Sequence, residues 1–124
     1  MTGDGTGDIV QIRITLQEIE PPIWRRVQVP ADLPLRRLHD VIQAVIGWLD
    51  YHLYRFEVGA KRYGPPELVG DNDFGPPTYS DRNTRLAQLI GRGVEQFIYT
   101  YDFGDDWRHD IVIERTLPAA PDVD

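Results

Sequence analysis

The chain has 124 residues, a formal net charge of −7, 41% hydrophobic residues and no cysteine. These values suit one folded domain and argue against disorder. They also exclude disulfides, thiolate nucleophiles and zinc–sulfur sites. No apolar run approaches the roughly 20 residues of a membrane-spanning helix. We therefore expect a cytoplasmic protein with no membrane segment.

The acidity of the chain also bears on its partners. Proteins that bind nucleic acid usually need a cationic surface, because neutralising phosphates dominates their affinity. The basic residues here include two small pairs, Arg25-Arg26 and Arg36-Arg37, and form no long block. A net charge of −7 would repel DNA, so nucleic acid is not expected as a partner.

Three regions are predicted along the chain. Residues 1–8 read as a flexible lead, because they lack the basic and apolar parts of a signal peptide. Residues 9–117 carry the periodic patterns of a single α+β domain. Residues 118–124 read as an acidic tail or a truncated continuation.

The first elements form a predicted hairpin followed by a helix. Residues 10–16 alternate apolar and polar side chains, as a strand with one buried face does, and residues 23–29 give a second strand in which Arg25 interrupts the inward face. Asp32 is the expected cap of a helix that ends near Gly47. Its apolar stripe, expected to cover the sheet, is Leu35, Leu38, Ile42, Val45 and Leu49.

The second half is predicted to be mostly strands. A strand over residues 52–58 turns into a short return at 62–64, and residues 65–84 make a structureless loop of a length that is often functional. Thr84 is the expected cap of a short helix. Strands at 97–101 and 107–116 close the domain.

This order predicts an α+β fold. We expect a single mixed or antiparallel sheet, with one main helix and one short helix packed on one face. A β-grasp-like arrangement fits the same order of elements.

The densest group of chemically active side chains lies between the last two predicted strands, from Tyr99 to His109. One hypothesis is a metal site. Its ligands would be Asp102, Asp105, Asp106 and His109, with His52 or Asp50 from a neighbouring strand. Oxygen ligands with a histidine suit Mn²⁺, Mg²⁺ or Zn²⁺, and such an ion can activate water for hydrolysis. The spacing matches no standard metal motif.

The alternative for this stretch is structural, and it is the commoner case for Asp and Gly in hairpin turns. Gly104 would then provide a positive φ, and Asp102 would accept backbone N–H groups across the turn. His109 would hydrogen-bond a carboxylate. His52 is expected at the edge of the core, and His39 on the helix surface or as a capping side chain.

A third group of residues is a candidate for partner binding. Trp24 stands beside Arg25 and Arg26 in the second predicted strand. Buried, this tryptophan would be a packing anchor. Exposed, it would mark a surface for a protein partner, because Trp and Arg are enriched at interfaces.

Several segments together resemble the plasmid pRiA-type "open reading frame three"-like family. They are residues 22–26, residues 38–43 with Gly47-Trp48, His52-Leu53 with Phe56, and residues 101–105 with Trp107 and His109. The resemblance covers residues 9–116. It implies an α+β fold in a bacterial or archaeal protein and little chemistry. Members also occur as passengers of an insertion element, where some carry a resolvase label.

The resolvase label does not fit this chain, which has a single serine, Ser80, and is acidic. We therefore expect a small binding or accessory module of a plasmid- and mobile-element-associated family, more readily than an enzyme. The alternative is a metal-binding protein or metal-dependent hydrolase that uses the Asp/His cluster.

Overall fold

The structure, a computed structural model, describes residues 8–48, 52–72 and 75–118. Its elements in chain order are β1 (Asp8–Leu16), β2 (Ile23–Pro30), α1 (Leu35–Ile46), β3 (Tyr54–Val58), β4 (Lys61–Gly64), the 3₁₀ turn η1 (Pro66–Leu68), β5 (Gly70–Asn72), β6 (Gly75–Ser80), α2 (Leu86–Gly91), β7 (Gln96–Tyr101) and β8 (Trp107–Pro118). The strands form one sheet in the order β2-β1-β8-β7-β3-β4-β6-β5.

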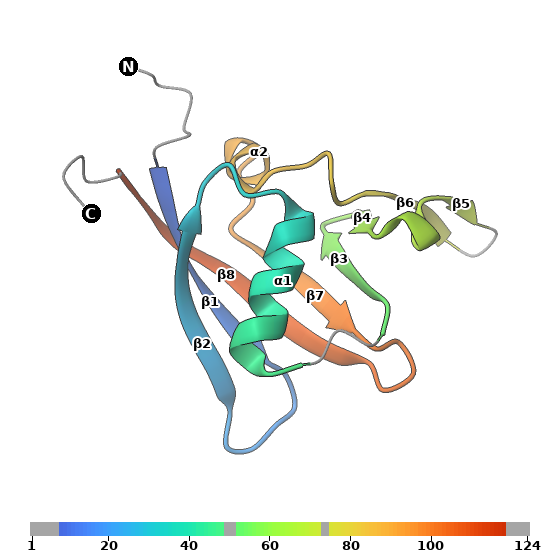
Figure 1. The fold of residues 1–124 in the computed structure, drawn as a ribbon, viewed down its shortest axis with the longest axis horizontal. Helices are drawn as coiled ribbons and strands as arrows, with labels where there is room; N and C mark the ends of the chain where they lie inside the picture. Colours follow the sequence, from blue (N-terminus) through green and yellow to red (C-terminus); the bar gives the residue numbers. More distant parts are fainter. Residues whose placement is uncertain (1–7, 49–51, 73–74, 119–124) are drawn as a thin grey trace.

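The predicted α+β fold is confirmed. The sheet is mixed, because β4 and β6 run parallel while the other pairs are antiparallel. Helix α1 lies across one face of the sheet (Figure 1). Apolar side chains of α2 join the same core as those of α1. The core members contributed by the helices are Leu35, Leu38, Ile42, Leu86 and Leu89.

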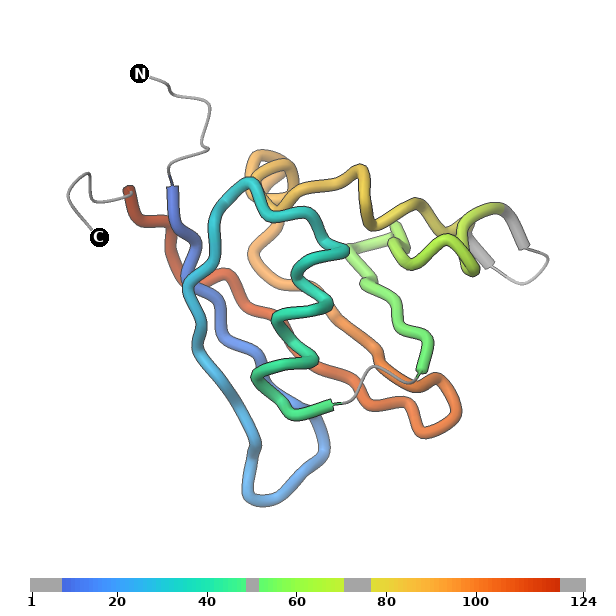
Figure 2. Tube along the Cα trace, viewed as in Figure 1, coloured from blue at the N-terminus to red at the C-terminus, as the bar shows by residue number. Residues whose placement is uncertain are grey.

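The predicted first hairpin is confirmed with an unbroken register, from Ile9 opposite Pro30 to Leu16 opposite Ile23. Strand β8 lies along the other side of β1, so the first and last described strands run side by side (Figure 2). The register between them shifts after Gln11, leaving Glu114 as the extra residue of a β-bulge.

Helix α1 begins differently from the prediction. Pro34, not Asp32, is the N-cap, and no side chain caps the helix. The chain before α2 takes that role: the N–H of Leu35 donates to the Thr84 carbonyl and that of Arg36 to the Asp81 carbonyl, both at 2.9 Å. A side-chain cap is therefore unnecessary. The predicted end is confirmed, with Gly47 at φ 96°, while Leu49 lies outside the described residues.

The prediction that residues 65–84 form a structureless loop is wrong. It contains η1, β5 and β6, and β6 extends the sheet by pairing with β4. The cap of α2 is also shifted, to Arg85, whose N–H donates to the Gln88 side chain at 2.7 Å. Thr84 does not cap α2, and its carbonyl is instead used at the start of α1.

Candidate functional site

The turn between β7 and β8 is held by its own backbone. The N–H groups of Asp105 and Asp106 donate to the Asp102 carbonyl at 3.0 and 2.6 Å. Positive φ values occur at Asp102 (63°) and Asp106 (60°). The prediction of a positive φ at Gly104 is wrong. Short Asp side chains tolerate this left-handed conformation better than most residues do. The turn is therefore built by aspartates rather than by the glycine.

His109 lies on the covered face of the sheet and is fully buried. Its Nε2 accepts the indole N–H of Trp48 at 3.1 Å, and its Nδ1 lies 3.1 Å from the Tyr99 carbonyl oxygen. An accepting Nε2 requires the proton on Nδ1, which then donates to that carbonyl. Burial lowers the pKa of His109, against a smaller opposing effect of the backbone hydrogen bonds. The ring is thus a neutral core histidine, without the predicted carboxylate partner.

The predicted metal ligands do not come together. His52 is exposed rather than at the core edge, and its Nε2 lies 3.5 Å from the Asp102 carboxylate. Asp106 pairs with Arg108 at 3.2 Å, and Asp105 is exposed in the turn. Among the described residues, no group of three or more His, Asp or Glu side chains is placed to hold a metal ion. Asp50 lies outside those residues.

A second polar cluster was not predicted. His39, expected on the surface of α1, is buried and stacks on Tyr54 with ring centroids 3.6 Å apart. Its Nδ1 lies 2.6 Å from the Tyr99 hydroxyl, which also accepts from the Gln43 amide at 2.9 Å. The available signal was spacing: His39 and Gln43 are four residues apart and flank the apolar stripe of α1.

Tyr54 also binds a buried carboxyl group. Its hydroxyl donates to Oδ2 of Asp81, a residue that is fully buried just after β6. Burial raises the pKa of Asp81, while the Tyr54 hydrogen bond and the charge of Arg36 oppose the rise. Burial is the main cause that raises the pKa of Tyr54, and the hydrogen bond to Asp81 raises it further. The phenol therefore stays protonated and its ring is held in place.

A pocket of about 380 Å³ opens beside Tyr54. Arg36 and His39 of α1 contribute one side, and Pro65 and Arg82 contribute others. No local pattern predicts this pocket, because its residues come from four separate segments that only the fold brings together. Aromatic, apolar and cationic side chains meet in this one concave site.

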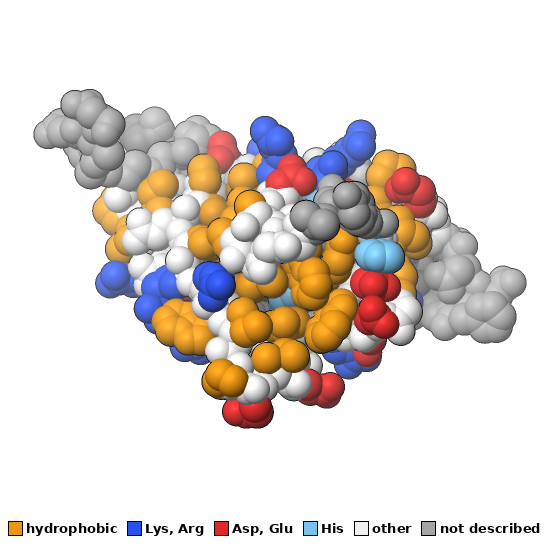
Figure 3. Space-filling view, turned by 60° about the horizontal axis from the view of Figure 1, so that its bottom comes forward, with side chains coloured by type: hydrophobic (Ala, Val, Ile, Leu, Met, Phe, Trp, Pro, Cys, Tyr) orange, Lys and Arg blue, Asp and Glu red, His pale blue; other side chains and the backbone are white. Residues whose placement is uncertain are grey.

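The predicted partner surface is exposed. Trp24 keeps 45% and Ile23 keeps 37% of their surface accessible. The guanidinium of Arg26 lies 5.2 Å from the Trp24 ring centroid. Arg25 turns back on the protein, donating to the carbonyls of Val45 and Trp24 at 3.1 and 2.8 Å. At this end of the molecule, hydrophobic side chains reach the surface beside Lys and Arg side chains (Figure 3).

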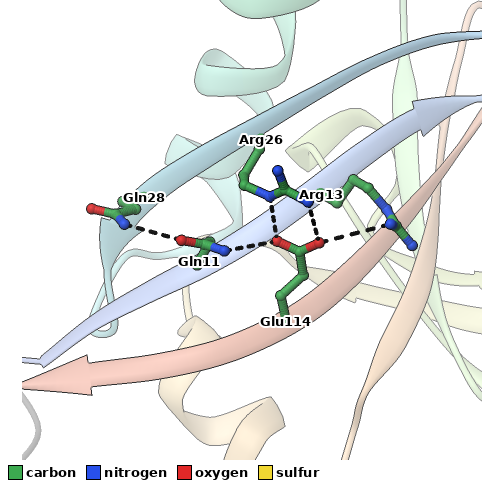
Figure 4. Close-up of polar contacts among 5 residues, drawn as sticks. All are labelled: Gln11, Arg13, Arg26, Gln28 and Glu114. Carbon is green, nitrogen blue, oxygen red and sulfur yellow. Dashed lines mark hydrogen bonds and ion pairs between the residues drawn. The ribbon is translucent and has the colours of Figure 1, made fainter.

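A polar network lies on the uncovered face next to this surface (Figure 4). Glu114 accepts two hydrogen bonds from Arg26, at 2.7 and 3.0 Å, and one from Gln11 at 2.9 Å. Arg13 lies 3.8 Å away. The bond to Arg26, more than any other contact, lowers the pKa of Glu114 to about 2. The β-bulge aims this carboxylate at the arginines of β1 and β2.

Comparison with known proteins identifies the family of this chain. Residues 8–124 match the family of plasmid pRiA4b ORF-3-like proteins. The chain belongs to this family. The predicted resemblance is therefore confirmed, together with the association of the ORF-3-like family with plasmids.

Two proteins are similar to the chain over most of its length. It is 42% identical over 113 residues to the uncharacterized protein y4hQ of Sinorhizobium fredii, covering 90% of this chain and 56% of y4hQ. It is similar to the crystal structure of MM3350, a protein of unknown function from Methanosarcina mazei, with a TM-score of 0.82 and 32% identity. That match covers 94% of this chain and 65% of MM3350. The chain thus spans less than two thirds of each relative. No helix within the described residues is long and apolar enough to cross a membrane.

Proposed function

We propose that the chain is a protein-binding accessory module that binds an acidic, partly apolar segment of its partner along strand β2. The observation that carries the proposal is Trp24, a large aromatic left 45% exposed on a regular strand. Tryptophan and arginine are enriched among the residues that dominate binding energy at interfaces. The plasmid- and mobile-element-associated setting predicted from the sequence is one in which an accessory role of this kind would act.

The position of β2 in the sheet supports this mode of binding. It is the first strand in the sheet order, and β1 is its one neighbour within the described residues. An edge strand presents backbone N–H and C=O groups to which an extended segment can add as a further strand. Side chains of alternate residues would then provide specificity. On β2, Trp24 and Arg26 project from the same, uncovered face.

Charge favours an acidic partner over a second copy of the chain. Strand β2 carries Arg25 and Arg26 and no carboxylate. Two copies pairing through β2 would bring arginines close to arginines, which is destabilising. A segment with Asp or Glu beside an apolar residue would complement Trp24 and Arg26, since the five N–H donors of Arg26 exceed the two bonds that it makes to Glu114.

The test is a peptide selection with matched variants. Peptides from a random phage-displayed library would be selected on the wild-type chain, and their affinities measured for Trp24→Thr. Threonine preserves strand preference and faces Thr15 across the hairpin. Tyr79→Thr is the control, because Tyr79 is an equally exposed aromatic on β6.

The proposal predicts that the selected peptides are acidic with an apolar residue. Trp24→Thr should weaken them by roughly tenfold or more, as loss of an aromatic anchor does, and Tyr79→Thr should not. Peptides without acidic character, or equal binding to Trp24→Thr, would contradict it. Self-association through β2, detected by analytical ultracentrifugation and abolished by Trp24→Thr, would also contradict it.

A further inference from the structure

The pocket beside Tyr54 has two chemically different sides. Leu53 and Pro65 provide apolar surface next to the tyrosine ring, while Arg36 and Arg82 provide positive charge. Its volume of about 380 Å³ lies at the low end for small-molecule sites. The pocket is therefore suited to a small molecule with an apolar body and one charged group.

The two arginines are placed to bind an anion. Both also line an adjoining hollow of about 380 Å³ at the start of α1, so their side chains stand where two depressions meet. Arg36 forms an ion pair with Asp40 through Nη1 at 2.9 Å. A guanidinium carries five N–H donors, so this pair leaves donors for a second oxyanion. Glu67, also in the pocket lining, would repel a second anionic group elsewhere on the ligand.

The aromatic floor of the pocket is fixed before any ligand arrives. Tyr54 is buried, its hydroxyl donates to Asp81, and His39 stacks on its ring at an interplanar angle of 10°. Asp81 is in turn tied into the backbone, its N–H donating to Gly64 and its carbonyl accepting from Arg36. A preorganised floor lowers the entropy that binding costs.

We propose that this pocket binds a small planar molecule carrying one carboxylate or phosphate group. The anion pairs with the guanidinium groups of Arg36 and Arg82, and the ring of the ligand lies against Tyr54 and Pro65. This site is separate from the β2 surface, so either can fail without the other.

The experiment uses three small probes with one phenyl ring each on the full chain: benzoate, phenyl phosphate and the uncharged benzamide. Each is titrated while the Nε–Hε signals of the arginine side chains and the backbone amide signals of the pocket residues are followed by NMR, and the amide signals give the affinities of the variants. The variant Arg36→Gln/Arg82→Gln removes the two charges. Arg115→Gln/Arg108→Gln removes two charges from exposed positions on β8 and serves as the matched control. Dispersed amide spectra establish that every variant is folded.

The proposal predicts saturable shifts of the Arg36 and Arg82 signals with at least one anionic probe and none with benzamide. Binding should weaken by about tenfold or more in Arg36→Gln/Arg82→Gln and change far less in the control. The tighter anionic probe identifies the group, carboxylate or phosphate. Equal binding of benzamide, equal loss in both double variants, or no saturable shift with either anion would overturn the proposal.

Discussion

The two faces of the sheet hold polar side chains in opposite ways. On the covered face, His39, Tyr99 and His109 are buried and each makes hydrogen bonds fixed by the surrounding core. On the uncovered face, Glu114 and Arg26 form a network at the surface. A buried polar group is costly to leave unpaired, whereas a surface ion pair is screened by water and salt. The polar groups of the covered face are therefore expected to contribute more to stability than the network on the uncovered face.

This difference changes the meaning of the Tyr99–His109 stretch. Its density of carboxylates, aromatics and histidine suggested a metal site, yet its residues divide between the two environments. His109 belongs to the core, and Asp105 and Asp106 belong to an exposed turn. Closeness in sequence did not produce convergence in space, because His109 projects from β8 into the core while Asp105 and Asp106 lie in the exposed turn before that strand.

The largest loss of stability is expected for His109→Ala. The substitution leaves a cavity and removes the hydrogen-bond partners of the Trp48 indole and the Tyr99 carbonyl. Together these should lower the free energy of unfolding by about 3 kcal/mol, measured by urea denaturation. His52→Ala is the control, since this exposed histidine should change stability by less than about 0.5 kcal/mol. Equal effects of the two substitutions would contradict the contrast between the faces.

Tyr99→Phe tests the buried cluster by removing one oxygen. The hydroxyl is the partner of both His39 and Gln43, so its loss should lower the free energy of unfolding by about 2 kcal/mol. Tyr79→Phe removes the same atom from an exposed ring and should have little effect. If Tyr99→Phe is as stable as the wild type, the cluster contributes nothing and this part of the account is wrong.

The covered face should also respond to pH. Burial lowers the pKa of His109 below its ordinary 6.5, so the unfolded chain binds a proton that the folded chain does not. The stabilising effect of a neutral His109 is complete above pH 6.5 and declines as pH falls below it. The decline is at most about 1.4 kcal/mol per pH unit. His109→Gln should show a shallower pH dependence than the wild type, and identical slopes would contradict the assignment.

The smallest change is expected on the uncovered face, for Glu114→Gln. The neutral amide loses the charge that holds Arg26, but all the groups involved stay close to water. The melting temperature should fall by less than for Tyr99→Phe, and the difference from wild type should shrink as salt is added. A large loss of stability that does not depend on salt would show that this network behaves like the core.

The Glu114 network should also depend on pH. Because the pKa of Glu114 is lowered to about 2, its contribution to stability is present above pH 4.5 and is lost as pH falls toward 2.

Much of the fold could be predicted because it depends on periodicity. The alternation in β1 and the apolar stripe of α1 each predict which side of one element is buried, and both sides are buried as expected. The prediction failed where distant segments replaced local signals. Asp32 did not cap α1, because the carbonyls of Asp81 and Thr84 already accept its first N–H groups.

The candidate sites were predicted less completely, for a related reason. From the sequence, Trp24 could be either a buried packing residue or an exposed one, and the structure exposes it on the outward side of β2. The burial of His39 depended on stacking against Tyr54, and the pocket depended on Pro65 and Arg82 meeting α1. Those contacts join residues far apart in the chain, and no local pattern encodes them.

The state of the His109 ring tests the central claim most directly. Long-range ¹H–¹⁵N NMR of the imidazole distinguishes the protonated nitrogen from the accepting one. We expect a proton on Nδ1, none on Nε2, no titration at the ordinary pKa of 6.5, and no change when Zn²⁺ or Mn²⁺ is added. A ring that titrates at 6.5, or an Nε2 signal that shifts with either metal, would instead make His109 an accessible ligand and contradict the division between the two faces.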